Sequence, residues 1–225
     1  DLSISDPMKN PLEKKENEAA VQRDTMLLKS LTIVVNVLYA LMIFQVFLIL
    51  PRPDDPELQY SSLEQVYSDN LAVLMVIVIG LIMILIYWIQ FHKLIGNLVR
   101  SSTVHASLAI FQMIFLMIYL YWLRFDMEFD GLTLALQMES IFLSLAGFTG
   151  ALSWVYARRN KLTSDQIDEK EEVSILYSIL PEPLAALFSL PFAVYGPGIW
   201  TLSFLVIIPI GMLLNWRKKK LYPVT

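Results

Sequence analysis

Polar and ionisable side chains interrupt the long apolar stretches of this sequence, and they are the first candidates for chemistry. Hydrocarbon penalises such groups, so those found there usually face other helices or water and often mark ion or proton pathways. Hydroxyls and amides can also hydrogen-bond to a neighbouring helix. The candidates are Thr32, Asn36, Gln45, Gln112, Glu139 and Glu182.

Glu139 and Glu182 are the two carboxyls of this set. Glu139 comes about two turns into its apolar stretch, and Glu182 stands between Pro181 and Pro183. A carboxyl at such depth is paired, faces water or carries a proton. Two interpretations stay open: binding of a proton or a cation, and ordinary solvation or hydrogen bonding near a membrane interface.

The first apolar stretch presents two different helix faces. Thr32, Asn36 and Tyr39 recur at intervals of four and three, so a helix places them on one side. The opposite side carries a leucine-rich stripe with one amide, made of Leu38, Leu41, Gln45 and Leu48. The polar face suits packing against other helices of the same subunit. The leucine-rich face could line a narrow pore or pack at a subunit interface.

These residues belong to six apolar stretches, each long enough to cross a bilayer as a helix of about 20 residues. The sequence therefore predicts an all-α polytopic membrane protein. The predicted membrane domain, 28–216, follows a polar N-terminal tail, 1–27, and precedes a basic C-terminal tail, 217–225. The predicted spans are Leu28–Leu50, Asn70–Phe91, Val104–Leu123, Leu132–Ala157, Val173–Tyr195 and Gly198–Trp216.

The basic residues alternate between the connections. All but two of the 17 Lys and Arg residues lie at the N-terminal end, in the second and fourth connections or in the C-terminal tail. The other side holds only Arg52 and Arg124. Basic segments stay in the cytoplasm during insertion. Both termini are therefore predicted to be cytoplasmic, in a multi-pass protein of the cell (inner) membrane.

Composition removes several classes of function. The chain is 56% hydrophobic and has no Cys and two His, which excludes disulfides and thiol catalysis and disfavours a histidine metal cluster. Phosphate-binding loops, metalloprotease motifs and basic–aromatic nucleic-acid surfaces are absent from the sequence. We expect no enzyme activity, no metal, no cofactor and no nucleic-acid partner, with membrane lipid as the surroundings.

Prolines set the shape of the last two spans. Pro181, Pro183 and Pro191 lie within the fifth span, so we expect it to be kinked or locally unwound. The sequence Gly196-Pro197-Gly198 then predicts a tight turn into the sixth span.

Two segments resemble the bacterial branch of the transmembrane protein 175 family of potassium-permeable channels. Val34 to Ala40, continuing to Leu50-Pro51-Arg52-Pro53, is similar to the family's first helix, in which an F-S-D motif precedes an apolar run and a proline-containing exit. Tyr87-Trp88 followed by His92 resembles the W…H pair that ends the family's second helix. The resemblance implies a homotetrameric channel for K⁺ or similar monovalent cations, with the first helix of four subunits around the pore.

The resemblance also assigns roles to residues of the first helix. Leu41 matches the family's hydrophobic constriction and Leu48 its deeper apolar ring, with Gln45 on the same stripe. Phe44 stands where the family carries a threonine. Asn36 replaces the carboxylate of F-S-D and keeps a packing role toward Trp88 and His92.

The sequence is also compatible with two other functions. The amide at Asn36 and the ring at Phe44 suit a non-conducting scaffold or accessory subunit of a larger complex on the same fold. A weaker alternative is a proton-coupled transporter that uses Glu139 and Glu182.

Overall fold

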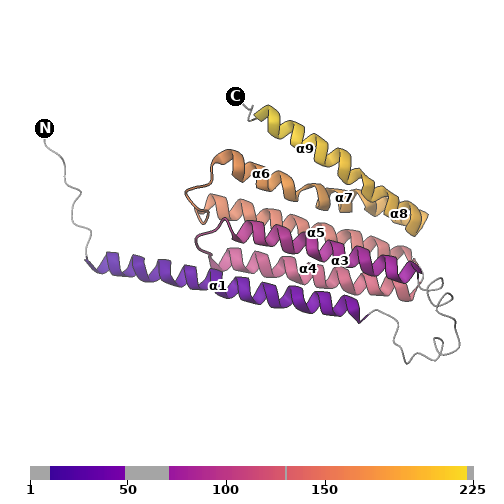
Figure 1. Ribbon diagram of the computed structural model, residues 1–225, viewed down its shortest axis with the longest axis horizontal. Helices are drawn as coiled ribbons and strands as arrows, with labels where there is room; N and C mark the ends of the chain where they lie inside the picture. The colour runs from indigo at the N-terminus through magenta and orange to yellow at the C-terminus, as the bar shows by residue number, and fades with distance from the viewer. Residues whose placement is uncertain (1–10, 49–70, 130, 222–225) are drawn as a thin grey trace.

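The chain folds as a bundle of long helices (Figure 1). The structure, a computed structural model, describes residues 11–48, 71–129 and 131–221. The predicted proline exit of the first span and the start of the second, at Asn70, lie outside the described residues, as do both ends of the chain. Within the described ranges every regular element is helical, and one isolated bridge pairs Leu98 with Thr163.

Four long helices form the first part of the bundle. They are α1 (Pro11–Phe47), α3 (Leu71–Ile95), α4 (Thr103–Glu128) and α5 (Thr133–Arg159). The N-terminal part of α1 projects beyond the other helices (Figure 1). The polar residues from Pro11 onward thus continue the helix of the first predicted span and form no separate element.

The fifth span is broken where its prolines predict. It comprises α6 (Glu169–Ile179), α7 (Pro181–Ser189) and the 3₁₀ helix η1 (Leu190–Tyr195). Pro181 and Pro183 have no amide hydrogen to donate, which interrupts the helix between α6 and α7. The predicted kink is confirmed.

The last span returns antiparallel to the fifth. Gly196, at a φ of 91°, reverses the chain as predicted. The segment after it consists of α8 (Pro197–Ser203), the 3₁₀ helix η2 (Phe204–Val206) and α9 (Ile207–Leu221). The described chain contains six helical segments long and apolar enough to cross a membrane, which confirms the predicted all-α polytopic fold. The limits of the membrane domain and its two tails remain predictions.

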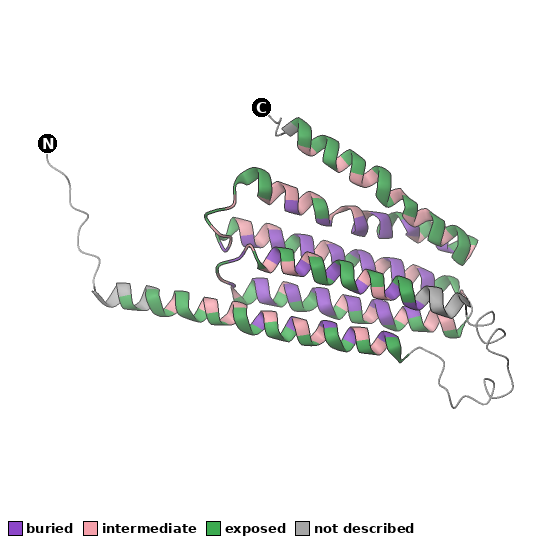
Figure 2. Cartoon of the chain, in the orientation of Figure 1, coloured by how far each residue is buried: buried purple, intermediate pink, exposed green. Residues whose placement is uncertain are grey.

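The core lies around α4 and α5, and the outer helices are exposed (Figure 2). Small residues allow close approach there: a Cβ on Gly147 would lie 2.6 Å from Pro183 Cβ of α7, and one on Gly150 would lie 2.6 Å from Gln112 Nε2 of α4. Small residues at helix contacts drive packing in membranes, where the hydrophobic effect between helices is absent.

Candidate functional site

Helix α1 attaches to its own bundle along one apolar stripe. The stripe recurs every three or four residues, which is the helical period. Its members, all at most 4% exposed, are Leu31, Val35, Tyr39, Met42 and Val46. Of the predicted polar face, only Tyr39 is fully buried. Thr32 and Asn36 lie half-buried beside the apolar stripe. The Thr32 hydroxyl donates a hydrogen bond to the carbonyl of Leu28, 2.9 Å away within the same helix.

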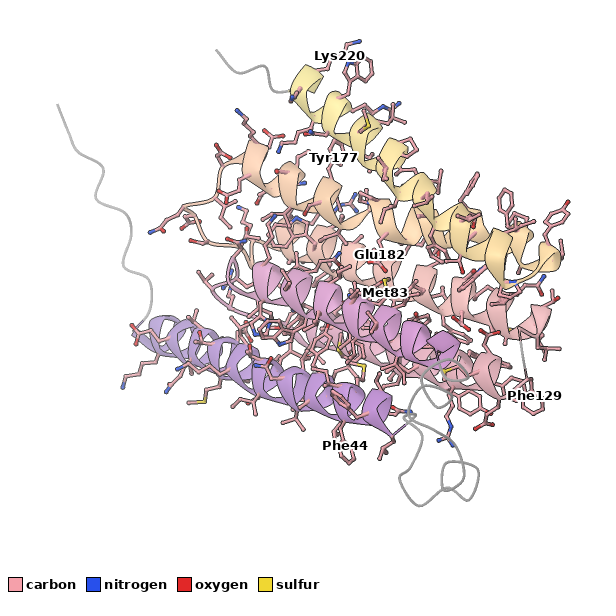
Figure 3. All side chains as sticks on the ribbon, turned by 45° about the vertical axis from the view of Figure 1, so that its right-hand side comes forward. Phe44, Met83, Phe129, Tyr177, Glu182 and Lys220 are labelled. Atoms are coloured by element: carbon pink, nitrogen blue, oxygen red, sulfur yellow. The ribbon has the colours of Figure 1, made fainter. Side chains whose placement is uncertain are left out.

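The predicted pore residues lie on the other side of α1. Leu41 is 56% exposed, Phe44 60% and Leu48 52%, so the bundle of a single chain leaves them uncovered. Phe44 points away from the other helices (Figure 3). Gln45 is half-buried at the edge of this face. Val37, which the sequence interpretation did not single out, is 53% exposed on the same side.

The predicted polar cluster brings α1 and α3 together. Trp88 Nε1 donates a hydrogen bond to Asn36 Oδ1 at 3.3 Å. The Trp88 and His92 rings pack with their centroids 4.3 Å apart, and His92 Nδ1 lies 2.9 Å from the Trp88 carbonyl oxygen. A carbonyl only accepts, so Nδ1 carries the proton of this bond. The three side chains therefore form one chain of contacts that fixes the rotation of α1 about its axis.

A shallow groove of about 460 Å³ runs beside this cluster between α1 and α3. Asn36, Trp88 and His92 line it together with Tyr39 and Leu85. Tyr39 packs its ring 6.2 Å from that of Phe91. The groove is mainly apolar, and the buried hydroxyl of Tyr39 has no hydrogen-bond partner in the described part of the chain.

Both predicted carboxyls are buried inside the bundle. Glu139 is 0% exposed and Glu182 5%, and their oxygens make no hydrogen bond of good geometry within the described chain. Tyr87 and Gln90 of α3 lie beside Glu182, which faces the middle of the bundle (Figure 3). The Tyr87 hydroxyl, however, donates to the carbonyl of Leu143, 3.0 Å away. The two carboxyls thus lie inside the bundle of a single chain, away from the exposed face of α1.

A hydroxyl relay that sequence reasoning missed fixes the start of the last span. Trp200 Nε1 donates to Ser140 Oγ at 2.8 Å, and Ser140 and Ser189 are joined through their Oγ atoms at 2.8 Å. Ser189 gives its own proton to the Ala186 carbonyl at 2.7 Å, so Ser140 is the donor between the two serines. The relay links α8 to α5 and α7. Serine is too common in membrane helices for its type alone to have indicated this.

Titratable side chains do not gather into a metal site in the described ranges, where no three His, Asp or Glu side chains come together. C-terminal to Asn36, the exposed face of α1 is apolar apart from the amide of Gln45, and the contact of Asn36 with Trp88 packs α1 against α3.

Comparison with known proteins supports the fold. No family model matches the chain, and no curated protein matches its sequence. Its fold, however, matches a solved structure, that of the potassium channel MtTMEM175, crystallised as a threonine-to-alanine variant in complex with a Nanobody-MBP fusion protein. The alignment has a TM-score of 0.60 at 15% identity and covers 84% of this chain and 93% of that one. At this identity the likeness shows a shared fold.

Proposed function

We propose that this chain is a subunit of a cation channel of the transmembrane protein 175 type, conducting K⁺ or similar monovalent cations. Four copies would surround a pore lined by α1. The observation that carries the proposal is the fold shared with a potassium channel over most of both chains. The uncovered apolar stripe of α1 supports it, because the subunit's own bundle leaves this stripe without a partner.

The stripe has the composition of a pore gated by dewetting. Leu41 and Leu48 are two turns apart and exposed, and rings of such side chains from four subunits would form narrow apolar constrictions. Gln45, between them, offers an amide to a passing cation. The hydrogen bond from Trp88 to Asn36, on the far side of α1, holds the stripe toward the axis.

Phe44 supports a second candidate, a non-conducting scaffold or accessory subunit. Its ring is 60% exposed on the proposed pore face, where the family resemblance implies a threonine. Four phenyl rings around one axis would close it to hydrated ions. The charge distribution supports both termini in the cytoplasm and the cell (inner) membrane as location for either candidate.

Flux through liposomes containing the purified protein tests the proposal. We expect K⁺ flux above that of empty liposomes and above Na⁺ flux, and a several-fold increase in Leu41→Ala, because a smaller ring lowers the dewetting barrier. Leu152→Ala is the matched control, since Leu152 is 55% exposed on α5, outside the proposed pore. No flux from the wild type, Leu41→Ala or Phe44→Thr, with a stoichiometric partner protein in the purified particle, would favour the scaffold.

A further inference from the structure

A pocket with several polar side chains lies between α6 and α9. The pocket has a volume of about 230 Å³ and extends from Lys218 to Gly211 on α9. Ser174 and Tyr177 line its α6 side, and Asn215 and Lys218 its α9 side. Donors from two helices therefore converge on a space that no described side chain fills.

Lys218 is positioned at this pocket by a direct contact. Its Nζ donates to Ser174 Oγ at 2.6 Å and keeps two further protons for other acceptors. Because Ser174 accepts this bond, its own hydroxyl proton remains available. The Asn215 amide and the Tyr177 hydroxyl add two more donors. Such a set suits an oxyanion with several acceptor oxygens.

A second hollow, nearer the end of α9, shares Tyr177 with the first. Its volume is about 500 Å³, and Tyr177, Trp216, Arg217 and Lys220 line it. Tyr177 thus borders both spaces, and Lys220 Nζ lies 5.6 Å from the centre of the Trp216 ring. Tyr177 on α6 and Lys220 near the end of α9 are labelled in Figure 3. Two cations and an indole therefore line a hollow on the other side of Tyr177 from the pocket.

Positive charge exceeds negative charge at the C-terminal end of α9. Arg217 to Lys220 are four consecutive cations, and none of them forms an ion pair within the described ranges. The nearby Glu172 is already bound to Arg158, with Oε2 2.7 Å from Nε. Glu169 and Glu171, in the first turn of α6, are exposed to solvent and line neither hollow.

We propose that this pocket binds the phosphate of an anionic lipid headgroup, such as that of phosphatidylglycerol. Basic pockets between helices at a membrane interface bind such headgroups. The surroundings favour a lipid over a free phosphate ion. Trp216, which lines the second hollow, is 59% exposed, and Leu213, about one turn away on α9, is 56% exposed; an exposed indole beside apolar surface is typical of the membrane interface. This proposal does not require that the protein conduct ions.

Binding to the full-length protein in neutral detergent, followed by native mass spectrometry, tests the site. We expect phosphatidylglycerol to bind, phosphatidylcholine to bind at least about tenfold more weakly, and millimolar inorganic phosphate to leave the bound lipid in place. Lys218→Gln should weaken phosphatidylglycerol binding about tenfold, because it removes a charge-assisted contact. Lys218→Arg should retain most of the affinity.

Lys219→Gln is the matched control, because it removes the same charge from the next residue, which lines neither hollow. We expect it to change the affinity by no more than about twofold, since water screens its interaction with a single headgroup. Equal losses in both variants would show diffuse charge attraction and overturn the proposal. So would equal binding of phosphatidylcholine, or displacement of the lipid by inorganic phosphate. Asn215→Leu, expected to weaken binding several-fold, provides the same test should Lys218→Gln not fold.

Discussion

Helices α1 and α9 both expose long apolar surfaces, but they attach to the bundle in different ways. Helix α1 buries one complete stripe and exposes the opposite one, whereas no described side chain from Pro197 to Lys220 is buried (Figure 2). Exposure confined to one face of an anchored helix is what a subunit contact or a pore requires. On α9 even the least exposed residues, such as Gly211, Leu214 and Lys218, are only half-buried, and a helix exposed over most of its circumference is typical of one that meets lipid. Hydropathy alone does not make this distinction.

The largest expected change in the free energy of unfolding comes from replacing a methionine by alanine on α1, with the same replacement on α9 for comparison. Met42 of α1 is 1% exposed and Met212 of α9 is 69% exposed. We expect Met42→Ala to lower the free energy of unfolding by about 2–5 kcal/mol, because it leaves a cavity in packed surroundings. Met212→Ala should change it by less than about 0.5 kcal/mol. Denaturant titration in detergent micelles measures both, and equal losses would contradict the difference between the helices.

A smaller loss of stability is expected from breaking the hydroxyl relay that joins α8 to α5 and α7. Ser140→Val removes the middle of the relay from Trp200 to Ser189 and leaves the Trp200 N–H without its acceptor. We expect a loss of about 1–3 kcal/mol, the cost of an unsatisfied polar group.

The same titration measures this loss, and the fluorescence of Trp200 should report its change of surroundings. Ser203→Val is the control, because within the described residues the hydroxyl of Ser203 bonds to the carbonyl of Trp200, 2.6 Å away, and to no other helix. Equal losses in the two serine variants would mean that the relay does not hold α8.

The sequence predicts the parts of this fold that depend on local chemistry. Apolar length predicts the spans, and the prolines predict the break between α6 and α7. Periodicity separates Leu41 from Asn36, and the structure places them on different sides of α1. It does not identify Val35 and Met42 as buried, because apolar residues cover both faces of a membrane helix and the contrast that marks a core in water is lost.

Contacts between distant residues could not be predicted. The relay joins residues 49 and 60 positions apart, and Lys218 meets Ser174 across 44 positions. Nothing in the residue types selects these partners from many serines and lysines. The Asn36–Trp88 contact spans 52 positions, and it is the family resemblance that predicts it.

Cross-linking of single cysteines tests the central claim, that the exposed stripe of α1 faces other copies of the chain. The natural sequence contains no Cys, so each variant carries a single reactive thiol. With a short bis-maleimide added to the membrane-embedded protein, Leu41→Cys should yield cross-linked dimers, and Met212→Cys should remain monomeric. Dimers from Met212→Cys alone, or equal cross-linking of the two variants, would contradict the claim.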